Sequence, residues 1–578
     1  MTPFRRRLLA LLTVLSVLLT ACGGDDDDGA TEDTTEDSEE GEGVRENDEE
    51  EAAGDDEPQY GGSITIGLEA ETNGWLPGTS QPANAGYSVY SAIYDPLVVR
   101  VEDGSIEPYL AESIEPNEDY TRWSFTLREG ITFHDGTDLT AEVIKRNWDE
   151  YLTAEGANTA GALEGITVEV TGPLTYDYVL EEGDAAFLDT LTTTPGYPFS
   201  VEAAEAGGED AGANPVGTGP FTFGSWTRDG QLVVNRNENY WRTDEAGNQL
   251  PYLDSITFRP IPDEDTRLDS VASGDIDVMQ TLRQSIVRSA RDLVDSGGYN
   301  SYEWLGNNGG SGIINTMKPP FDDKRVRQAL VLAVDQEQMI EVLGGTGITP
   351  PQTQWFTQDS PWYSEAAADA WYDYDPEAAQ ALLDEYINDP ERSDGQAPGT
   401  PISFTYDCPP DPSLVELSQA YQAFWQQVGL EVNLDSKEQS AHITAGIGTE
   451  NDPFLRGDFD VQCWRLGSQA DPYSVWSSAF GPVESEVLNV SDWTHPDVTA
   501  KLEELRVEGD TDERKRIVEE ISLILAEEVP NFWTGGTATA IVAREEVRGI
   551  LGGVTPSGTP IDGASDAIIR APYLWLAQ

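Results

Sequence analysis

The chain carries three histidines, His134, His442 and His495, at positions far apart in the sequence. No HExxH motif occurs, so the helical zinc site of the metalloproteases is excluded. The GxSxG elbow of serine hydrolases, the Gly-Lys pair of a P-loop and the CxxC of thiol redox proteins are also absent from the sequence. Acidic residues are so abundant that no single carboxylate pair indicates a glycosidase. We therefore predict that the protein is not an enzyme, binds no cofactor and has no dedicated metal site.

One cysteine, Cys22, points to chemistry of a different kind. It follows an arginine cluster at residues 5–7 and a 14-residue apolar run at residues 8–21, which is too short to span a bilayer. The letters LTAC at the end of this run resemble the lipobox of bacterial lipoproteins. The resemblance implies that residues 1–21 are a signal peptide and that Cys22 becomes a lipidated N-terminus. The alternative is an ordinary signal peptide with an incidental cysteine.

Residues 22–57 are expected to form a disordered tether. Residues 25–57 contain 19 acidic residues and one basic residue, and such a segment cannot bury enough apolar surface to offset its loss of conformational entropy. No EF-hand spacing that would indicate calcium is present there. We therefore expect the lipid on Cys22 to be the only contact between the protein and the membrane.

The whole chain is strongly acidic, with 106 acidic and 33 basic residues and a formal net charge of −73. This charge excludes nucleic acid as a partner, because its phosphates would be repelled. A saline habitat would also favour such acidity, and the sequence does not separate that cause from ligand chemistry. Residues 58–578 are too many for one hydrophobic core, so two or three domains are expected.

The other two cysteines, Cys408 and Cys463, each end a run of residues that is typical of a β-strand. Adjacent strands could bring the two thiols together, and an exported protein favours a disulfide. Two separate buried thiols are the alternative, and the sequence leaves both open.

Strands and helices alternate along the chain. Ile64, Ile66 and Leu68 alternate with small or polar residues, as in a half-buried strand. Helices are predicted where a capping residue precedes apolar residues at helical spacing. The three clearest caps are Thr140, Asp375 and Asp510, the last with Glu513 in a capping box. This alternation predicts α/β lobes with largely parallel sheets.

Four long segments carry a resemblance to a known family. They are PYLAESIEPNEDYTRWSFTLREGITFHDGTDLTAEVIKRNW (residues 108–148), NPVGTGPFTFGSWTRDGQLVVNRNENYW (214–241), NTMKPPFDDKRVRQALVLAVD (315–335) and DPYSVWSSAFGP (471–482). In this order they resemble the landmarks of the family 5 extracellular solute-binding proteins. Members of that family are the peptide-, dipeptide- and nickel-binding components of ABC importers.

The resemblance implies an α/β fold of two lobes, like that of periplasmic binding proteins, with an extra domain inserted in lobe I. Two strands would cross between the lobes, and ligand would lie between the lobes as they close about a hinge. The implied boundaries are residues 58–87, 214–305 and 531–578 for lobe I, 88–213 for the inserted domain, and 306–530 for lobe II.

Ligand-contacting residues are expected in loops at strand ends, where open α/β sheets bind ligands. Three loops fit: EAETNGW at residues 69–75, LGNNGGSG at residues 305–312 and CWRLGSQADP at residues 463–472. Together with one tryptophan outside them, they give eight candidate ligand-binding residues: Glu71, Asn73, Trp75, Asn307, Asn308, Trp355, Trp464 and Gly467. The three tryptophans could stack on a ligand, and core packing is the alternative for each.

Gly467 marks a departure from the family pattern. Dipeptide- and oligopeptide-binding relatives carry an aspartate about three residues after a tryptophan, and it holds the α-amino group of the ligand. Here the tryptophan is Trp464, and Gly467 stands at the matching position. A peptide ligand is therefore left open.

The resemblance implies the substrate-binding component of an ABC importer, which captures a peptide or similar small polar solute and delivers it to permease subunits in the membrane. We expect a monomer that is lipid-anchored outside the cytoplasm, in the periplasm or on the outer face of the cell membrane. An extracellular enzyme or adhesin on the same fold is the alternative. Ligand-driven closure of the lobes would separate the two.

Overall fold

The computed structural model describes residues 57–80, 85–153, 163, 165–410, 412–447, 457–465, 471–482, 489–561 and 567–577. The predicted signal peptide, Cys22, the tether up to residue 56, and Gly467 lie outside the described residues. Within the described ranges, no helix combines the length and the apolar character needed to cross a membrane.

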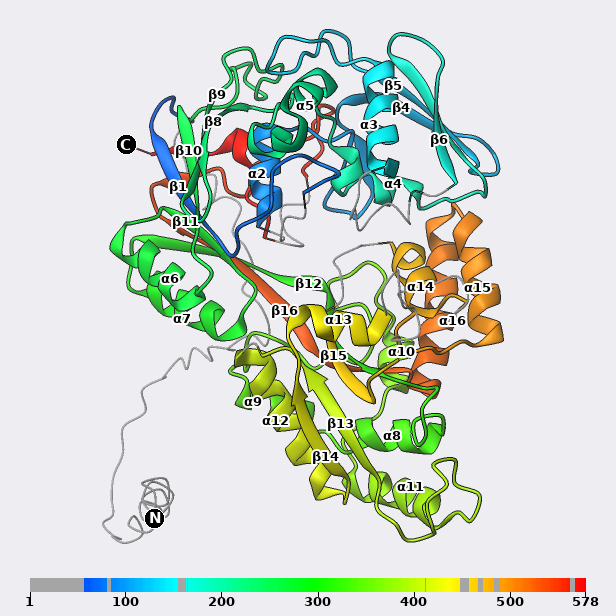
Figure 1. Ribbon diagram of the computed structural model, residues 1–578. Helices are drawn as coiled ribbons and strands as arrows, with labels where there is room; N and C mark the ends of the chain where they lie inside the picture. Colours follow the sequence, from blue (N-terminus) through cyan, green and yellow to red (C-terminus); the bar gives the residue numbers. More distant parts are fainter. Residues whose placement is uncertain are drawn as a thin grey trace, which may run out of the picture. The chain divides into compact units, whose positions relative to one another are not determined.

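A ten-stranded sheet runs through both lobes (Figure 1). Its strand order is β14-β13-β15-β12-β16-β11-β1-β10-β9-β8. Lobe I contains β1 (Ser63–Leu68), β8 (Phe221–Thr227), β9 (Gln231–Arg236), β10 (Ser255–Pro260) and β11 (Val278–Thr281). Lobe II contains β13 (Ser403–Cys408), β14 (Glu431–Ser436) and β15 (Val461–Arg465). Between them lie two long strands, β12 (Tyr299–Ile314) and β16 (Asn531–Arg544).

The two long strands, which we call the crossover strands, pair with each other and join the lobes. The first part of β12, from Tyr299 to Leu305, pairs with β16 where β16 also pairs with β11 of lobe I. The last part, from Gly310 to Ile314, pairs with β16 and with β15 of lobe II. The pairing register shifts between Leu305 and Gly309. The regular ladder is therefore interrupted where the chain passes from one lobe to the other.

The main sheet is mixed, whereas the sequence pattern predicted largely parallel sheets. Within lobe I β1 is parallel to β10 and β11, and within lobe II β13 is parallel to β14 and β15. The crossover strands are antiparallel to each other and to their neighbours, and β8 and β9 form an antiparallel hairpin. The prediction is wrong at the crossover because β12 leads out to lobe II and β16 returns, so the two strands run in opposite directions.

A second, antiparallel sheet lies in the sequence between β1 and β8. Trp123, Phe125 and Leu127 of its strand β5 alternate into the core, and none is more than 5% exposed. The ring of Trp148 packs edge-on against Tyr178, with 4.8 Å between ring centroids. We call this unit the small-sheet domain: β4 (Ala111–Pro116), β5 (Arg122–Leu127), β6 (Ile166–Val170), β7 (Thr175–Leu180), α3 (Ala141–Thr153), α4 (Phe187–Thr190) and α5 (Val201–Gly207).

Helices cover the strands of both lobes. In lobe I, α6 (Glu264–Ser273) and α7 (Gln284–Asp295) pack against β11, where Leu268 and Ile286 share a core cluster with Met279. The remaining α-helices are α2 (Gly86–Ile93), α8 (Lys324–Leu332), α9 (Gln336–Val342), α10 (Glu365–Ala370), α11 (Pro376–Asn388), α12 (Pro412–Gln427), α13 (Gln439–Ile447), α14 (Pro472–Phe480), α15 (Pro496–Val507) and α16 (Thr511–Glu528). Short strands complete the described part: β2 (Val98–Arg100), β3 (Ile106–Pro108), β17 (Val547–Arg548) and β18 (Trp575–Leu576).

The predicted helix starts are confirmed at the residues that cap them. The side chains of Thr140, Asp375 and Asp510 accept hydrogen bonds from backbone amides in the first turns of α3, α11 and α16. The capping box predicted with Glu513 is only half formed, because Glu513 accepts a 2.8 Å hydrogen bond from Arg516 instead of reaching back to the Asp510 amide. A guanidinium one turn away offers a charge-assisted bond, which a neutral amide cannot match.

Candidate functional site

The carboxyl ends of strands from both lobes meet at the crossover strands. In lobe I, β11 runs toward Gly536 of β16, because the two strands are antiparallel and Thr281 pairs with Ala540. In lobe II, β15 ends where Arg465 pairs with Gly310 of β12. Open α/β sheets bind ligands at strand ends of this kind. This stretch of the crossover strands is therefore the candidate site.

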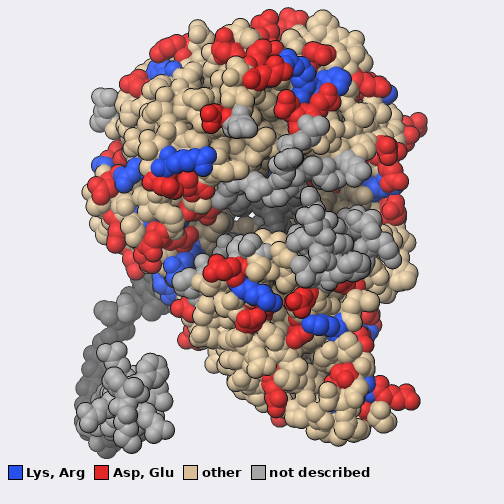
Figure 2. All heavy atoms as spheres, viewed as in Figure 1, with Lys and Arg blue, Asp and Glu red and all other residues tan. Residues whose placement is uncertain are grey.

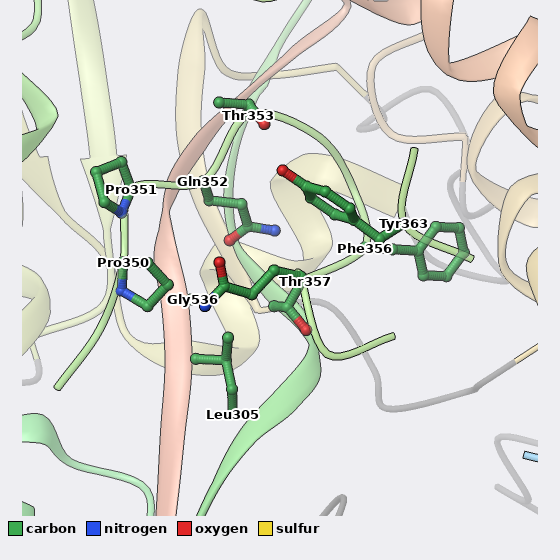
Figure 3. Close-up of a pocket in the computed structure, with 10 residues that line it drawn as sticks. Leu305, Pro350, Pro351, Gln352, Thr353, Phe356, Thr357, Tyr363 and Gly536 are labelled. Carbon is green, nitrogen blue, oxygen red and sulfur yellow. The ribbon is translucent and has the colours of Figure 1, made fainter. Parts of the chain in front are cut away.

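A pocket lies beside this stretch (Figure 3). It is a small, partly open hollow with a cavity volume of about 20 Å³, which is room for about one water molecule. Two lining residues belong to the crossover strands and the others to the segment at residues 349–364, which we call the pocket loop. The lining residues are Leu305, Pro350, Pro351, Gln352, Thr353, Phe356, Thr357, Gln358, Tyr363 and Gly536. None of them carries a charge, so the pocket suits an uncharged group.

Polar side chains hold the pocket loop and also face the pocket. The Thr357 hydroxyl donates a 2.6 Å hydrogen bond to the Gly306 carbonyl of β12. The Gln352 amide donates to two carbonyls of the same loop at 2.8 and 3.1 Å, while its oxygen is buried and accepts no hydrogen bond from any described residue. Figure 3 shows the Gln352 side chain and the Tyr363 hydroxyl pointing toward the same central space. The Gln352 oxygen is thus an acceptor that a ligand donor can satisfy.

The predicted residues Glu71 and Asn73 lie in a loop that is attached to the β8–β9 hairpin. The Glu71 carboxylate accepts a 2.9 Å hydrogen bond from the Asp229 amide. Arg228 donates a 2.6 Å hydrogen bond to the Asn73 carbonyl. These bonds hold the loop in lobe I, and a ligand contact of either side chain stays a prediction.

The three predicted tryptophans differ in burial. Trp75 is 2% exposed, and its ring packs edge-on against Trp226 at 5.9 Å. Trp355 of the pocket loop is 5% exposed and belongs to a lobe II core cluster. Trp464 is half-buried on β15, where its ring stacks on His442 at 5.9 Å. Burial favours core packing for Trp75 and Trp355, and stacking of a ligand on Trp464 stays a prediction.

The other predicted positions lie beside the register shift or outside the described residues. Asn307 and Asn308 are in β12 between Leu305 and Gly309, and the structure describes only their backbone. Leu305 lines the pocket, so this backbone lies next to it. Gly467 lies in the segment 466–470, which is outside the described residues.

A buried charged network lies at the end of β13. Asp407 is 1% exposed and forms an ion pair with Lys437. The Nδ1 atom of His442 lies 3.3 Å from the Asp407 carboxylate, and its Nε2 atom lies 2.9 Å from the Cys463 carbonyl. Burial by itself would raise the pKa of Asp407, but the hydrogen bond from His442 and the charged Lys437 hold it below its usual value. The network attaches α13 to two neighbouring strands.

A disulfide joins Cys408 and Cys463, whose Cα atoms are 5.3 Å apart. The two cysteines follow the parallel pairs Tyr406–Val461 and Asp407–Gln462 of β13 and β15. The two strand-like runs that end in cysteine are thus neighbours in the sheet. The bond fixes the carboxyl ends of two lobe II strands to each other beside the site.

Sequence reasoning missed the pocket loop apart from Trp355. The available signal was PPQTQWFTQ at residues 350–358, where neutral amides and hydroxyls follow two prolines. Gln352 is 4% exposed and Thr357 is 3% exposed, although polar residues of these types are mostly exposed. A segment of this composition has no periodicity, so nothing in the sequence marked it as buried.

Two features of the described residues concern metal-binding clusters and the distribution of charge on the visible face. In the described part of the chain, no group of three or more His, Cys, Asp or Glu side chains is arranged to hold a metal ion. Figure 2 shows acidic side chains spread over the visible face of both lobes, with fewer basic ones among them.

Known proteins share this architecture and are similar in sequence over most of the chain. The dipeptide-binding protein of Escherichia coli (strain K12) is 25% identical over 505 residues, which cover 81% of this chain and 87% of that protein. Di/tripeptide-binding protein 1 of Pseudomonas aeruginosa (strain UCBPP-PA14) is 26% identical over 464 residues, covering 73% of this chain and 79% of the relative. The solved structure of the ABC transporter substrate-binding protein CtaP from Listeria monocytogenes superposes with a TM-score of 0.72 at 21% identity. It covers 90% of this chain and 100% of its own, which shows the shared fold.

A family model matches about two thirds of the chain. Residues 105–486 match the family described as bacterial extracellular solute-binding proteins, family 5, middle region. This span contains the small-sheet domain, the first crossover strand and the pocket loop. The chain belongs to family 5 of the bacterial extracellular solute-binding proteins.

Proposed function

We propose that the protein is the substrate-binding component of an ABC importer, which captures a small polar solute between its lobes and delivers it to a permease. One observation carries this proposal: strand ends of both lobes meet at the crossover strands, beside an uncharged pocket. A solute bound there contacts the elements that join the lobes. It can therefore stabilise one arrangement of the lobes over another.

The proposed solute is a peptide or a similar amide-bearing compound, of which one uncharged group would reach this pocket. The relatives from Escherichia coli and Pseudomonas aeruginosa are named as dipeptide- and di/tripeptide-binding proteins. The buried Gln352 oxygen can accept a hydrogen bond from an amide N–H, and the Tyr363 hydroxyl can donate or accept one. Because no lining residue is charged, we propose that the pocket holds an uncharged part of the solute and not its charged ends.

The crossover strands are the proposed hinge. At the level of the register shift, Gly535 of β16 has a φ of 116°, which is a conformation that favours glycine. Gln284 of lobe I donates a 3.3 Å hydrogen bond to the Gly536 carbonyl, and Thr357 of lobe II donates to the Gly306 carbonyl. Each lobe thus holds one crossover strand at this level. Small changes of backbone dihedral angles between these attachments would rotate the lobes.

Ligand-driven closure tests this function. Native mass spectrometry of the purified chain identifies co-purifying solutes, and calorimetry then measures their binding together with a set of di- and tripeptides. Small-angle scattering is expected to show a smaller radius of gyration with the bound solute. No compaction with any of these compounds would contradict the proposal.

A charge placed in the pocket tests the binding site itself. Gln352→Glu is expected to weaken solute binding at least about tenfold, because a buried carboxylate without a partner is costly. Gln419→Glu makes the same change at an exposed position of α12, and it should bind as the unmodified protein does. Equal affinities for the two variants would place the solute elsewhere.

We also propose that the mature chain begins at Cys22, whose lipid holds the protein outside the cytoplasm. Two acyl chains anchor a protein durably, whereas one binds only reversibly. The acidic residues 25–57 would be repelled by anionic lipid headgroups and would keep the lobes away from the surface. Cys22→Ser should therefore release the protein from the membrane fraction or leave an uncleaved precursor, with unchanged solute affinity. A processed Cys22→Ser chain that stays membrane-bound without detergent would require another anchor.

A further inference from the structure

We propose that residues 182–189 of the small-sheet domain form a latch that binds lobe II and holds the lobes closed. This inference rests on the proposed opening of the lobes. Residues 182–189 do not line the pocket. They would change the affinity for the solute only by changing how stable the closed arrangement of the lobes is.

The small-sheet domain is attached to lobe I. His134 donates its backbone amide to the Gly217 carbonyl at 2.9 Å, and its ring Nε2 atom lies 3.0 Å from the Gly219 carbonyl. Both glycines lie in the segment that leads into β8 of lobe I. When lobe II rotates about the crossover strands, it must therefore move relative to the small-sheet domain as well.

The first contact of the latch is with the end of α15 in lobe II. The Ala185 amide donates a 2.7 Å hydrogen bond to the Arg506 carbonyl. The Arg506 guanidinium forms an ion pair with Glu182 at 2.9 Å. In Figure 1, α4 and α15 lie close together at this point. The Glu182 side chain is 78% exposed, so dissolved salt weakens the pair.

The second contact is a carboxylate at the start of α14. Asp189 lies near the Asp471 backbone and the Ser474 side chain, and Asp471 is the N-cap of this helix. A carboxylate is stabilised there by unpaired backbone amides and by the helix dipole. Asp189 is 3% exposed and also pairs with Arg100 of β2. It loses its helix partners when the lobes separate, so this contact favours the closed state.

Charged groups of both signs face each other across the contact. The Asp184 carboxylate accepts a 2.8 Å hydrogen bond from the Ala186 amide. It interacts electrostatically with Asp471, Arg514 and Arg506 of lobe II. Asp471 in turn pairs with Arg514 at 2.6 Å. The stability of the closed state therefore depends on the charges at this contact and on ionic strength.

Hydrogen exchange at the Ala185 amide tests the latch without any solute. Residue-resolved mass spectrometry of the full chain in detergent measures this amide and the β5 amides, which report on the fold of the domain. Glu182→Gln is expected to accelerate Ala185 exchange about two- to fivefold at low salt. Asp189→Asn is expected to accelerate it about tenfold, since a charged helix-end contact is lost. Exchange in β5 should not change.

Glu503→Gln is the matched control, because Glu503 pairs with the same Arg506 guanidinium at 3.0 Å from within α15. It should leave Ala185 exchange unchanged. If Asp189→Asn also accelerates exchange in β5, this variant has destabilised the domain itself. The latch is then tested by comparing Ala185 exchange in Glu182→Gln and in its control, Glu503→Gln.

Two results overturn the latch. The first is that the Ala185 amide exchanges as slowly as the β5 amides in every variant and in about 1 M salt. This result would mean that the contact opens only when the protein unfolds. The second is that Glu503→Gln accelerates Ala185 exchange as much as Glu182→Gln does. The acceleration would then come from a change within α15 and not from the contact with Glu182. Neither result depends on a solute, so failure of the latch is distinguishable from failure of solute capture.

Discussion

The Thr357 hydroxyl donates its hydrogen bond to the Gly306 carbonyl at 2.6 Å, so the pocket loop is fixed to β12 at the register shift. Thr357 is 3% exposed. Thr357→Val keeps the shape of the side chain and leaves a buried carbonyl without its donor. We expect the free energy of unfolding to fall by about 1–3 kcal/mol. Urea unfolding followed by tryptophan fluorescence measures this change.

Thr353→Val is the control, because it makes the same chemical change at a half-buried position of the same loop. Its free energy of unfolding should stay within about 0.5 kcal/mol of that of the unmodified protein. Equal losses for the two variants would mean that the bond to Gly306 contributes nothing specific.

Gly312 of β12 lies directly opposite Phe532 of β16. A Cβ atom on Gly312 would collide with the Phe532 ring, so Gly312→Ala should destabilise the protein by about 1–3 kcal/mol. Phe532→Leu removes the colliding atoms, and the double variant should lose less stability than the sum of the two single variants. If the losses of unfolding free energy in urea are strictly additive, the Gly312 position and the Phe532 ring are not in steric conflict.

The Cys408–Cys463 disulfide closes a loop with a sequence separation of 55 residues. Restricting the unfolded chain in this way stabilises a protein by about 2–4 kcal/mol. Replacing both cysteines by serine should lower the melting temperature, and a reducing agent should lower it only in the unmodified protein. A reductant effect of the same size in the double-serine variant would exclude the disulfide as its cause.

Asp184 makes the latch dependent on pH. Burial is the main cause that raises the pKa of Asp184, to about 7. The negative charge of Asp471 adds to it, whereas the Ala186 amide and the charges of Arg514 and Arg506 oppose it. With lobe II removed, the pKa should return toward the ordinary value of about 3.9. The closed state then binds the proton more tightly than the open state does.

The sign of the pH effect follows from this raised pKa. The stabilisation is complete below about pH 4 and is lost as the pH rises through about 7. Ala185 exchange, corrected for its intrinsic pH dependence, should therefore accelerate between about pH 5 and 7 and level off above about pH 8. Asp184→Asn should reduce this dependence, and a profile identical to that of the unmodified protein would rule Asp184 out.

Local elements could be predicted wherever the signal lies in neighbouring residues. Ile64, Ile66 and Leu68 alternate in the sequence, and all three are at most 2% exposed in β1. Asp375 was predicted as a cap, and its side chain accepts the Ala378 amide at the start of α11. Such features depend on spacings of two to four residues, which backbone geometry fixes.

The candidate site was only partly predictable. The sequence predicts ligand contacts in the loops after β1 and in β12 because strand ends bind ligands. Strand ends of both lobes do meet at the crossover strands. The pocket loop was missed because Gln352 and Thr357 have no periodic pattern that indicates burial. Trp75 and Trp355 could not be assigned to ligand or core, because an aromatic residue looks the same in either role.

The sequence by itself determined the strands, the caps and the family landmarks, because each depends on residues that are close together in the chain. Only the tertiary structure decided which distant residues meet: Thr357 with Gly306, Cys408 with Cys463, and Ala185 with Arg506. These contacts depend on the order and direction of strands in the main sheet. That order is set by the burial of whole elements against one another, which no local spacing encodes.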